Sequence, residues 1–451
     1  MEKMHLKQMA YVLGGDPLPD LPIEGFAVDS RLVLPGSVFF ALKGAHSDGH
    51  CFLEEVKRKG AICAVVSKEF SQEIPGLLLL KVEDVLASLH KLATWKMSQK
   101  KTRCIAVTGS VGKTTTKEFI STLLEGAFTV QKTPGSANSQ IGFPLSILNA
   151  TGEGEFFVTE MGMSEKGNIA NLIKIAPPEF VVMTKVALAH SLFFPGGLEE
   201  IAEAKAEILS HSHTRKAFIH MQARQFPAFQ QQEYFEKVFY GLSSDEFVQS
   251  GDVLLQQAIG CFYVEKERDR LTKNFALPFT ARHLSENFLV AALVAREVGM
   301  SWEQIFVQAQ LLAPYKMRFE AVPKDGVLYI NDAYNANPES MKAALQNLPA
   351  PQKGGKVIAV LGEMRELGAF SQAAHQEIGK IAASHADLLL CLVGDAVHMG
   401  TEFSKSGKPS QFFLTLKELQ KELLLQVKPG DVVLVKASKS LKMWEVLEEI
   451  V

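Results

Sequence analysis

Short apolar runs of strand length recur along the chain, and polar turns or amphipathic stretches separate them. In the N-terminal part, runs at 37–44, 60–67 and 76–82 alternate with a helical stretch at 52–60. Alternation of strand-like and helix-like segments is typical of α/β proteins. We therefore predict that residues 1–82 form a small α/β domain.

The central part begins with an amphipathic helix at 83–101 and continues into a buried strand at 103–110. A glycine-rich loop and a helix at 113–126 follow directly, and further strands are predicted at 156–162 and 180–187. In open α/β sheets, ligands bind at the carboxyl ends of the strands. The order of strand, glycine loop and helix therefore predicts a central, doubly wound parallel sheet of the P-loop type.

The apolar pattern restarts after proline and glycine interrupt it between 311 and 326. Four more apolar strands separated by helical stretches predict a Rossmann-like C-terminal domain. These strands are expected at 326–334, 356–364, 386–394 and 431–438. The predicted fold is thus α/β with three domains, and the second and third domains are expected at 83–313 and 314–451.

Composition changes this picture little. The chain of 451 residues carries 47 basic and 50 acidic residues, so its net charge of −3 gives no reason to expect nucleic acid or a membrane surface as partner. Five scattered cysteines form no C-x-x-C pair, and no N-terminal apolar region indicates a signal peptide. We expect a cytosolic monomer without membrane insertion.

The most informative stretch is VTGSVGKTTTK at 107–117. Gly109 and Gly112 would allow backbone N–H groups to converge on phosphate oxygens at a helix N-terminus. Lys113 would bridge the β- and γ-phosphates, and the Thr114 hydroxyl would bind Mg²⁺. The predicted nucleotide-binding residues of this loop are Thr108, Gly109, Ser110, Val111, Gly112, Lys113, Thr114 and Thr115.

Three further polar residues carry a weaker signal. Glu160 follows an apolar strand, where a carboxylate would serve as a second Mg²⁺ ligand, but a solvated loop glutamate is an equal alternative. A lone histidine after an apolar run, such as His190, is more often a hydrogen-bonded loop residue than a ligand. Lys205 fits a surface lysine among glutamates. Their pattern alone decides none of these alternatives.

Several motifs taken together resemble the ATP-dependent Mur ligases of peptidoglycan synthesis. The shortened ATP loop, in which Val107 stands where a P-loop has glycine, is similar to that of the family. Further motifs follow in the family's order, as TEMG, AH, AKAEIL, RHLSEN and MRFE. The chain departs from the family pattern after His190, where it reads SLFFPGG, and at Leu284. The resemblance spans nearly the whole chain and implies ATP and Mg²⁺ as cofactors.

Three other stretches resemble one branch of this family, which joins D-alanyl-D-alanine to UDP-N-acetylmuramoyl-tripeptide. They are DAYNANP at 332–338, LGEMRELG at 361–368 and the segment from DSR to DGH at 29–50. The resemblance implies an amide ligase that works through an acyl phosphate and forms UDP-N-acetylmuramoyl-pentapeptide. It also implies that the three predicted domains bind, in order, the UDP substrate, ATP and the acceptor dipeptide.

The resemblance also implies roles for single residues. The implied catalytic residues are Lys113, Lys205, Arg318 and Asp332, with Lys205 matching a lysine that relatives carbamylate. The implied metal ligands are Thr114, Glu160, His190 and Lys205. Beyond the loop, the nucleotide would contact Asn287 and Arg318. The implied substrate-binding residues are Ser30, Arg31, Asn335 and Asn337.

Other functions stay open at this point. The nearest alternative is another Mur-type or folylpolyglutamate-type ligase, against which DAYNANP and the segment at 29–50 argue. A nucleotide-driven switch would use the same loop without amide chemistry. A non-catalytic UDP-sugar binder would not need the intact loop at 112–115.

Overall fold

The computed structural model describes residues 3–44, 47–231, 234–242, 253–258, 261–266, 269–271, 276–448 and 450. Ala45 and His46, inside the predicted UDP-substrate segment, lie outside these ranges. The chain divides into two compact units, which are described separately. The first unit contains residues 1–106, 127–181 and 208–215, and the second contains 107–126, 182–207 and 216–451.

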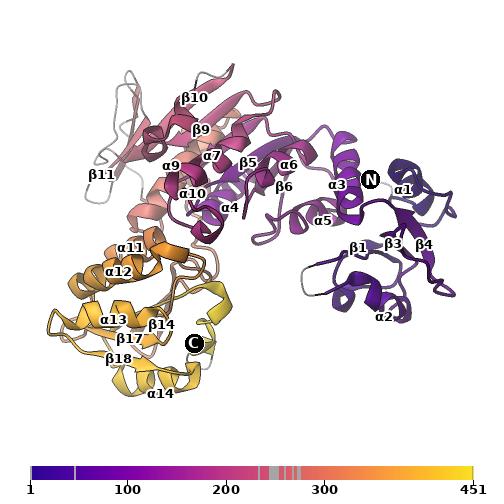
Figure 1. Cartoon of the computed structure of the whole chain (residues 1–451). Coiled ribbons are helices and arrows are strands. Elements are labelled where there is room, and N and C mark those ends of the chain that lie inside the picture. Colours follow the sequence, from indigo (N-terminus) through magenta and orange to yellow (C-terminus); the bar gives the residue numbers. More distant parts are fainter. Residues whose placement is uncertain are drawn as a thin grey trace. The chain divides into compact units, whose positions relative to one another are not determined.

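The N-terminal sheet is parallel throughout, with the order β1-β2-β3-β4 (Figure 1). Its strands are β1 (Gly25–Ala27), β2 (Ser37–Phe40), β3 (Cys63–Ser67) and β4 (Leu78–Val82), and its helices are α1 (Leu6–Leu13), α2 (Leu53–Arg58) and α3 (Val85–Ser98). Phe39, Val56 and Val66 belong to the buried cluster between sheet and helix. The strands at 37–44, 60–67 and 76–82 are therefore confirmed.

The second sheet has nine strands in the order β13-β12-β11-β10-β9-β8-β5-β7-β6. They are β5 (Arg103–Thr108), β6 (Val130–Lys132), β7 (Phe156–Glu160), β8 (Phe180–Met183), β9 (Lys216–His220), β10 (Glu236–Leu242), β11 (Val253–Ala258), β12 (Cys261–Lys266) and β13 (Asp269–Leu271). The associated helices are α4 (Lys113–Leu124), α5 (Gly142–Asn149), α6 (Asn168–Ile175), α7 (Leu198–Ala206), α8 (Pro227–Gln230), α9 (Arg282–Glu297) and α10 (Trp302–Ala309). β7 and β8 are buried along their whole length, as expected for parallel strands covered on both faces.

The C-terminal sheet has six strands in the order β14-β15-β19-β16-β17-β18. They are β14 (Glu320–Lys324), β15 (Val327–Asn331), β16 (Val357–Leu361), β17 (Leu388–Leu392), β18 (Ser410–Phe413) and β19 (Val432–Lys436). Figure 1 shows α12 (Ser371–His385) and α13 (Ala396–Ser404) on one face and α14 (Leu416–Gln426) on the other. The remaining helices are α11 (Pro338–Gln346) and α15 (Glu445–Glu448). Five of the six strands pair in parallel, which confirms the Rossmann-like prediction.

Several strands lie outside the predicted ranges, and β14 is one of them. β14 occupies part of the interrupted region and pairs antiparallel with β15 at the edge of the sheet. Pro323 lies within β14, and an edge strand tolerates proline because the ladder needs no N–H on its outer side. Pro323, one of the residues that indicated a domain boundary, therefore lies inside a strand.

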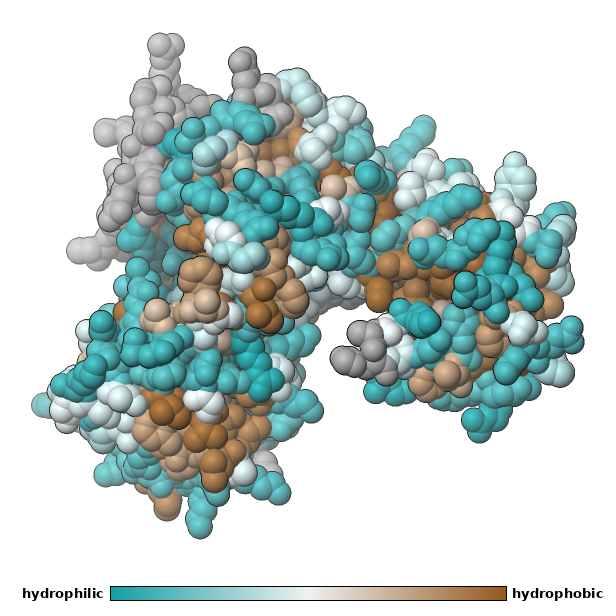
Figure 2. All heavy atoms as spheres, viewed as in Figure 1, coloured by the Kyte–Doolittle hydropathy of each residue, from teal (hydrophilic) through white to brown (hydrophobic). Residues whose placement is uncertain are grey.

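The surface carries a mixture of polar and apolar side chains. Figure 2 shows hydrophilic residues over much of the visible face, with smaller hydrophobic areas between them. The exposed apolar side chains include Leu414, Leu424 and Leu425, at or next to α14. Every helix within the described ranges is too short or too polar to cross a membrane.

Candidate active site

The glycine-rich loop lies between β5 and α4, and two of its glycines are sterically required. Gly109 has φ 144° and Gly112 has φ 83°, values that favour glycine. A Cβ atom on Gly109 would stand 1.8 Å from Thr184 Oγ1, and one on Gly112 would stand 2.7 Å from Asn287 Oδ1. The loop therefore brings backbone N–H groups to the N-terminus of α4, an arrangement suited to phosphate.

Residues just after β8 hold this loop in shape. The Ser110 N–H donates to the Lys185 carbonyl at 2.8 Å, and the Ser110 hydroxyl donates to the Ala187 carbonyl at 2.8 Å. The Thr184 hydroxyl donates to the Val111 carbonyl at 2.6 Å. Because both sides of the loop are tied to the 184–187 segment, the loop is pre-organised.

Two lysines meet at one carbonyl of the loop. Lys113 Nζ donates to the Gly109 carbonyl at 2.8 Å, and Lys205 Nζ, from α7, donates to the same oxygen at 3.1 Å. Lys205 is only 3% exposed. The alternative that Lys205 is an ordinary surface lysine is therefore wrong, and its side chain lies at the phosphate loop.

His190 lies close to these lysines and faces a carboxylate. It precedes the short 3₁₀ helix Ser191–Phe193, and its Nδ1 is 2.6 Å from Glu366 Oε2. Burial lowers the pKa of His190, the nearby Glu366 carboxylate raises it, and the positive charges of Lys113 and Lys205 lower it. The structure thus groups His190 with both lysines of the phosphate loop.

Glu160 belongs to the first unit, at the end of β7. Its side chain is buried, and Asn138 Nδ2 donates to its carboxylate at 2.5 Å. The reading of Glu160 as a solvated loop residue is therefore wrong. No group of three or more His, Cys, Asp or Glu side chains suited to a metal occurs among the residues that the structure describes.

Arg318 and Asn287 both lie against the phosphate loop. Arg318 Nη2 donates to Thr114 Oγ1 at 3.4 Å, and its guanidinium stacks 3.8 Å from the centre of the Tyr334 ring. Asn287, on α9, accepts a hydrogen bond from Thr116 Oγ1 at 3.2 Å. The structure therefore places both residues predicted to contact the nucleotide next to the loop.

Asp332 forms a buried ion pair just past β15. Its Oδ2 lies 2.6 Å from Nζ of Lys436, which is 2% exposed, and its Oδ1 accepts the Phe319 N–H at 3.0 Å. Burial lowers the pKa of Lys436, and the Asp332 charge opposes that shift. Asp332 thus anchors the residue that follows Arg318, and its carboxylate holds the end of β15 to β19.

The two asparagines of DAYNANP have different surroundings. Asn337 caps α11, where its side chain accepts the Ser340 N–H at 2.8 Å in a capping box. Asn335 is exposed, and its side-chain oxygen accepts the Lys439 N–H at 3.3 Å. Asn337 thus stabilises the start of α11, whereas Asn335 is exposed to solvent.

Ser30 and Arg31 lie in the first unit, in the 3₁₀ helix Ser30–Leu32. Ser30 Oγ donates to Glu55 at 3.1 Å, and Arg31 forms an exposed ion pair with Asp29 at 2.6 Å. Hydrogen bonds from Arg31 lower the pKa of Asp29 to about 2. These side chains form a polar cluster with their own neighbours.

Comparison with known proteins identifies the family. Three family descriptions match: "Mur ligase family, catalytic domain" at 22–94, "Mur ligase middle domain" at 107–295 and "Mur ligase, glutamate ligase domain" at 317–439. The UDP-N-acetylmuramoyl-tripeptide–D-alanyl-D-alanine ligase of Bacillus subtilis is 31% identical over 95% of this chain and 93% of its own length. The chain belongs to the Mur ligase family. The resemblance drawn from its motifs is therefore confirmed.

Solved structures of other Mur ligases agree with the three-domain α/β fold. A MurF crystal structure from Acinetobacter baumannii has a TM-score of 0.86 at 26% identity and covers 100% of this chain and 99% of that one. The MurF ligase from Thermotoga maritima, solved in complex with ADP, has a TM-score of 0.79 at 33% identity. That alignment covers 94% of this chain and 96% of that one.

Some residues at the site of this Mur ligase were missed from the sequence. Lys185 and Glu286 form a partly buried ion pair of 2.7 Å beside the loop, and Glu366 faces His190. Lys436 could have been identified from the sequence, because it is a lysine at the end of an otherwise apolar strand. The other three carry no local signal, since each gains its partner from a distant segment.

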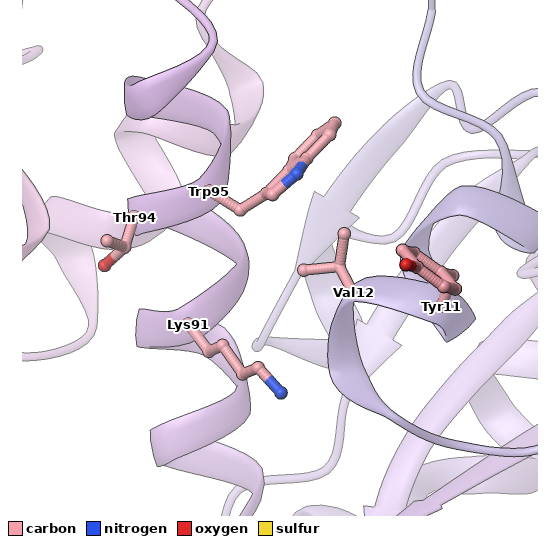
Figure 3. Close-up of a pocket in the computed structure, with 5 residues that line it drawn as sticks. All are labelled: Tyr11, Val12, Lys91, Thr94 and Trp95. Atoms are coloured by element: carbon pink, nitrogen blue, oxygen red, sulfur yellow. The ribbon is translucent and has the colours of Figure 1, made fainter.

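One cavity of this Mur ligase is lined by none of the predicted site residues. It measures about 640 Å³ and is lined by Tyr11, Val12, Lys91, Thr94 and Trp95. Figure 3 shows Lys91 and Trp95 projecting from α3 toward α1, which carries Tyr11 and Val12. Its lining is mainly apolar, without the convergent polar groups that fix a ligand's orientation.

Proposed function

We propose that this chain is an ATP-dependent amide ligase that joins D-alanyl-D-alanine to UDP-N-acetylmuramoyl-tripeptide and forms UDP-N-acetylmuramoyl-pentapeptide. Curated relatives with that name match over nearly the whole chain. The observation that carries the proposal is the meeting of Lys113, Lys205 and Arg318 at the phosphate loop. A nucleotide switch would not need the Arg318 loop of the C-terminal domain at that position.

The proposed chemistry solves the poor reactivity of a carboxylate toward amines. The terminal carboxylate of the tripeptide attacks the γ-phosphorus of ATP, which gives an acyl phosphate and ADP. The amine of D-alanyl-D-alanine then attacks the acyl carbon, and phosphate leaves from the tetrahedral intermediate. Lys113 and Arg318 offset the negative charge that gathers between carboxylate and triphosphate.

The residues present fit Mg²⁺. Thr114 and the buried Glu160 offer the oxygen atoms that Mg²⁺ prefers, and Mg²⁺ ordinarily takes its other ligands from phosphate and water. His190 and Lys205 complete the proposed ligands, with Lys205 as a carbamate because an ammonium group cannot bind a cation. When bound, Mg²⁺ supplies charge neutralisation at the phosphate oxygens.

The carbamate has its own test. Lys205→Ala should lose most ligase activity, and formate or acetate should restore part of it, because a small carboxylate would occupy the place of the carbamate oxygens. Phosphate release by this variant at the rate of the unsubstituted chain would contradict the role of Lys205.

The remaining assignments follow the domain order, with residues 1–82 for the UDP substrate, 83–313 for ATP and 314–451 for the acceptor. Ser30 and Arg31 contact the UDP substrate, whereas Asn335 and Asn337 line the acceptor side. Asp332 acts on turnover by holding the Arg318 loop. The enzyme acts as a cytoplasmic monomer without nucleic acid.

The function is tested by phosphate release from ATP with UDP-N-acetylmuramoyl-tripeptide, with and without D-alanyl-D-alanine, while product mass is followed. Release that requires both substrates, together with the pentapeptide mass, is expected. Release that ignores the dipeptide would point to another ligase or to a switch.

A further inference from the structure

The segment after β8 is joined to the loop after β16 by hydrogen-bonding contacts. The Leu192 N–H donates to the Glu366 carbonyl at 2.9 Å, and the Ser191 hydroxyl lies 3.2 Å from the Leu367 carbonyl and 3.4 Å from the Glu366 carbonyl. A further contact is the 2.6 Å approach of His190 Nδ1 to Glu366 Oε2. The C-terminal domain thus supplies a carboxylate to a residue of the ATP-binding domain, and both lie in the second unit.

Both partners have an uncommon backbone conformation. His190 has φ 60° and Glu366 has φ 63°, values that few residues other than glycine adopt. Such conformations are strained and persist where the surroundings determine them. The 2.6 Å contact brings the two side chains together. Two strained residues in contact indicate that the His190–Glu366 pair has a functional role.

Stability is a poor explanation for the pair. The His190 side chain is 36% exposed and the Glu366 side chain 47% exposed. Exposed ion pairs contribute little to stability, less than such backbone strain costs. The location is more informative, because His190 is also influenced by the charges of Lys113 and Lys205 at the phosphate loop.

Histidines that bind metal ions usually donate their second ring N–H to a carboxylate, which fixes the tautomer and the orientation of the ring. A bond from His190 Nδ1 to Glu366 would leave Nε2 for a metal. We infer that Glu366 is a positioning residue that orients His190 toward the nucleotide-bound metal ion. This inference rests on the proposed function. It implies that His190 is oriented for the metal ion only when the loop that carries Glu366 is in place.

The test measures metal binding directly. Mn²⁺ replaces Mg²⁺, ADP is present at saturation, and free Mn²⁺ is counted by electron paramagnetic resonance for the full-length chain and its variants. The variants are Glu366→Ala, Glu366→Gln, His190→Ala and the double variant H190A/E366A. Ser191→Ala is the matched control, because it removes a contact between the same two loops and keeps the carboxylate. Thermal unfolding is recorded for every variant.

Glu366→Ala should weaken Mn²⁺ binding about 10- to 100-fold, the usual effect of losing such a partner. Glu366→Gln should weaken it less, since the amide oxygen still accepts from Nδ1. The double variant should bind no more weakly than His190→Ala, because Glu366 acts through His190. Ser191→Ala should stay within about twofold of the unsubstituted chain, because it keeps the carboxylate that would orient His190.

Several results would overturn the inference. They are unchanged Mn²⁺ binding in Glu366→Ala, additive losses in the double variant, equal losses in Ser191→Ala and Glu366→Ala, or no Mn²⁺ binding by the unsubstituted chain with ADP. The assay needs neither muropeptide nor dipeptide. The inference therefore survives if the expected binding pattern is found while ligase activity is absent, a result that would reject the proposed function alone.

Discussion

The phosphate loop and the 29–31 segment are both predicted to bind substrate phosphates or sugar, but different forces hold them. In the loop, Gly109 and Gly112 have conformations and neighbours that leave no room for a side chain. In the 29–31 segment, exposed side chains pair with one another, as Arg31 does with Asp29. A packed backbone responds sharply to change, whereas an exposed ion pair can be lost at little cost in stability. We therefore expect large effects around the loop and small ones in the segment.

The largest effect is expected for Lys113→Ala. Turnover should fall about 1,000-fold or more, because removing one pre-organised group that stabilises charge typically costs about 100- to 1,000-fold and Lys113 would contact two phosphates. Folding should be preserved, since Lys113 Nζ bonds to loop carbonyls that belong to the same turn. Phosphate release and thermal unfolding check both parts.

Lys405→Ala is the control for this experiment, because Lys405 forms an exposed ion pair with Glu402 on α13, far along the chain from the loop. It should leave turnover unchanged. If turnover of Lys113→Ala stays within tenfold of that of the unsubstituted chain, the loop has no part in the mechanism. The expected contrast between the loop and the 29–31 segment would then be wrong.

The next effect is expected for Asp332→Ala, which leaves Lys436 buried without its carboxylate. Removing one partner of a buried pair usually costs about 3–5 kcal/mol in unfolding free energy. Turnover should also fall more than affinity for the UDP substrate, because the Arg318 loop loses its anchor. Urea unfolding and steady-state kinetics measure the two quantities.

Asp332→Asn separates the two roles, since its amide oxygen still accepts the Phe319 N–H while the charge is lost. It should be destabilised nearly as much but keep more of the turnover. If Asp332→Ala unfolds at the same urea concentration as the unsubstituted chain, the ion pair has no structural role.

The pH dependence of stability should also differ between the two units, through His283 in the second and Asp29 in the first. Burial lowers the pKa of His283, at the start of α9, from 6.5 to about 4. The unfolded chain therefore binds this proton first, and stability present above pH 6.5 is lost as the pH falls toward 4. The shift corresponds to about 3 kcal/mol at most. The pKa of Asp29 is also lowered, from 3.8 to about 2, so the stability from its pair is present above pH 3.8 and is lost only below it.

Urea unfolding between pH 7 and pH 4 tests this prediction. His283→Gln should flatten the loss of stability in that range, whereas Asp29→Asn should leave the slope as it is. His220, buried beside Tyr240, also has a lowered pKa, so some slope should remain in His283→Gln. An unchanged slope in His283→Gln would show that His283 titrates normally.

The fold and the phosphate loop were readable from the sequence because local forces determine them. Buried parallel strands need continuous apolar runs, and the loop needs glycine at positions where no Cβ fits. The approach of Arg318 to Thr114 was implied by the family resemblance and not by any local pattern.

Other parts of the site could not be predicted, for two physical reasons. The His190–Glu366 and Lys185–Glu286 pairs join segments that only the tertiary fold brings together. Asn337 illustrates the second reason, because an asparagine before a helix serves as a cap as readily as it binds a substrate. A sequence motif indicates which residue type occurs at a position, but only the tertiary packing determines which partner that residue contacts.

The smallest effect on stability is expected for Arg31→Ala. Its side chain is 83% exposed and pairs with a neighbour two residues away, so the free energy of unfolding should hardly change. The KM for the UDP substrate should nevertheless rise while kcat stays constant, because a group that binds substrate and transition state equally affects KM alone. Lys68→Ala, which breaks another exposed pair of the same unit, should change neither quantity. A fall in kcat at unchanged KM would place Arg31 outside substrate binding, and a large loss of stability would contradict the contrast between segment and loop.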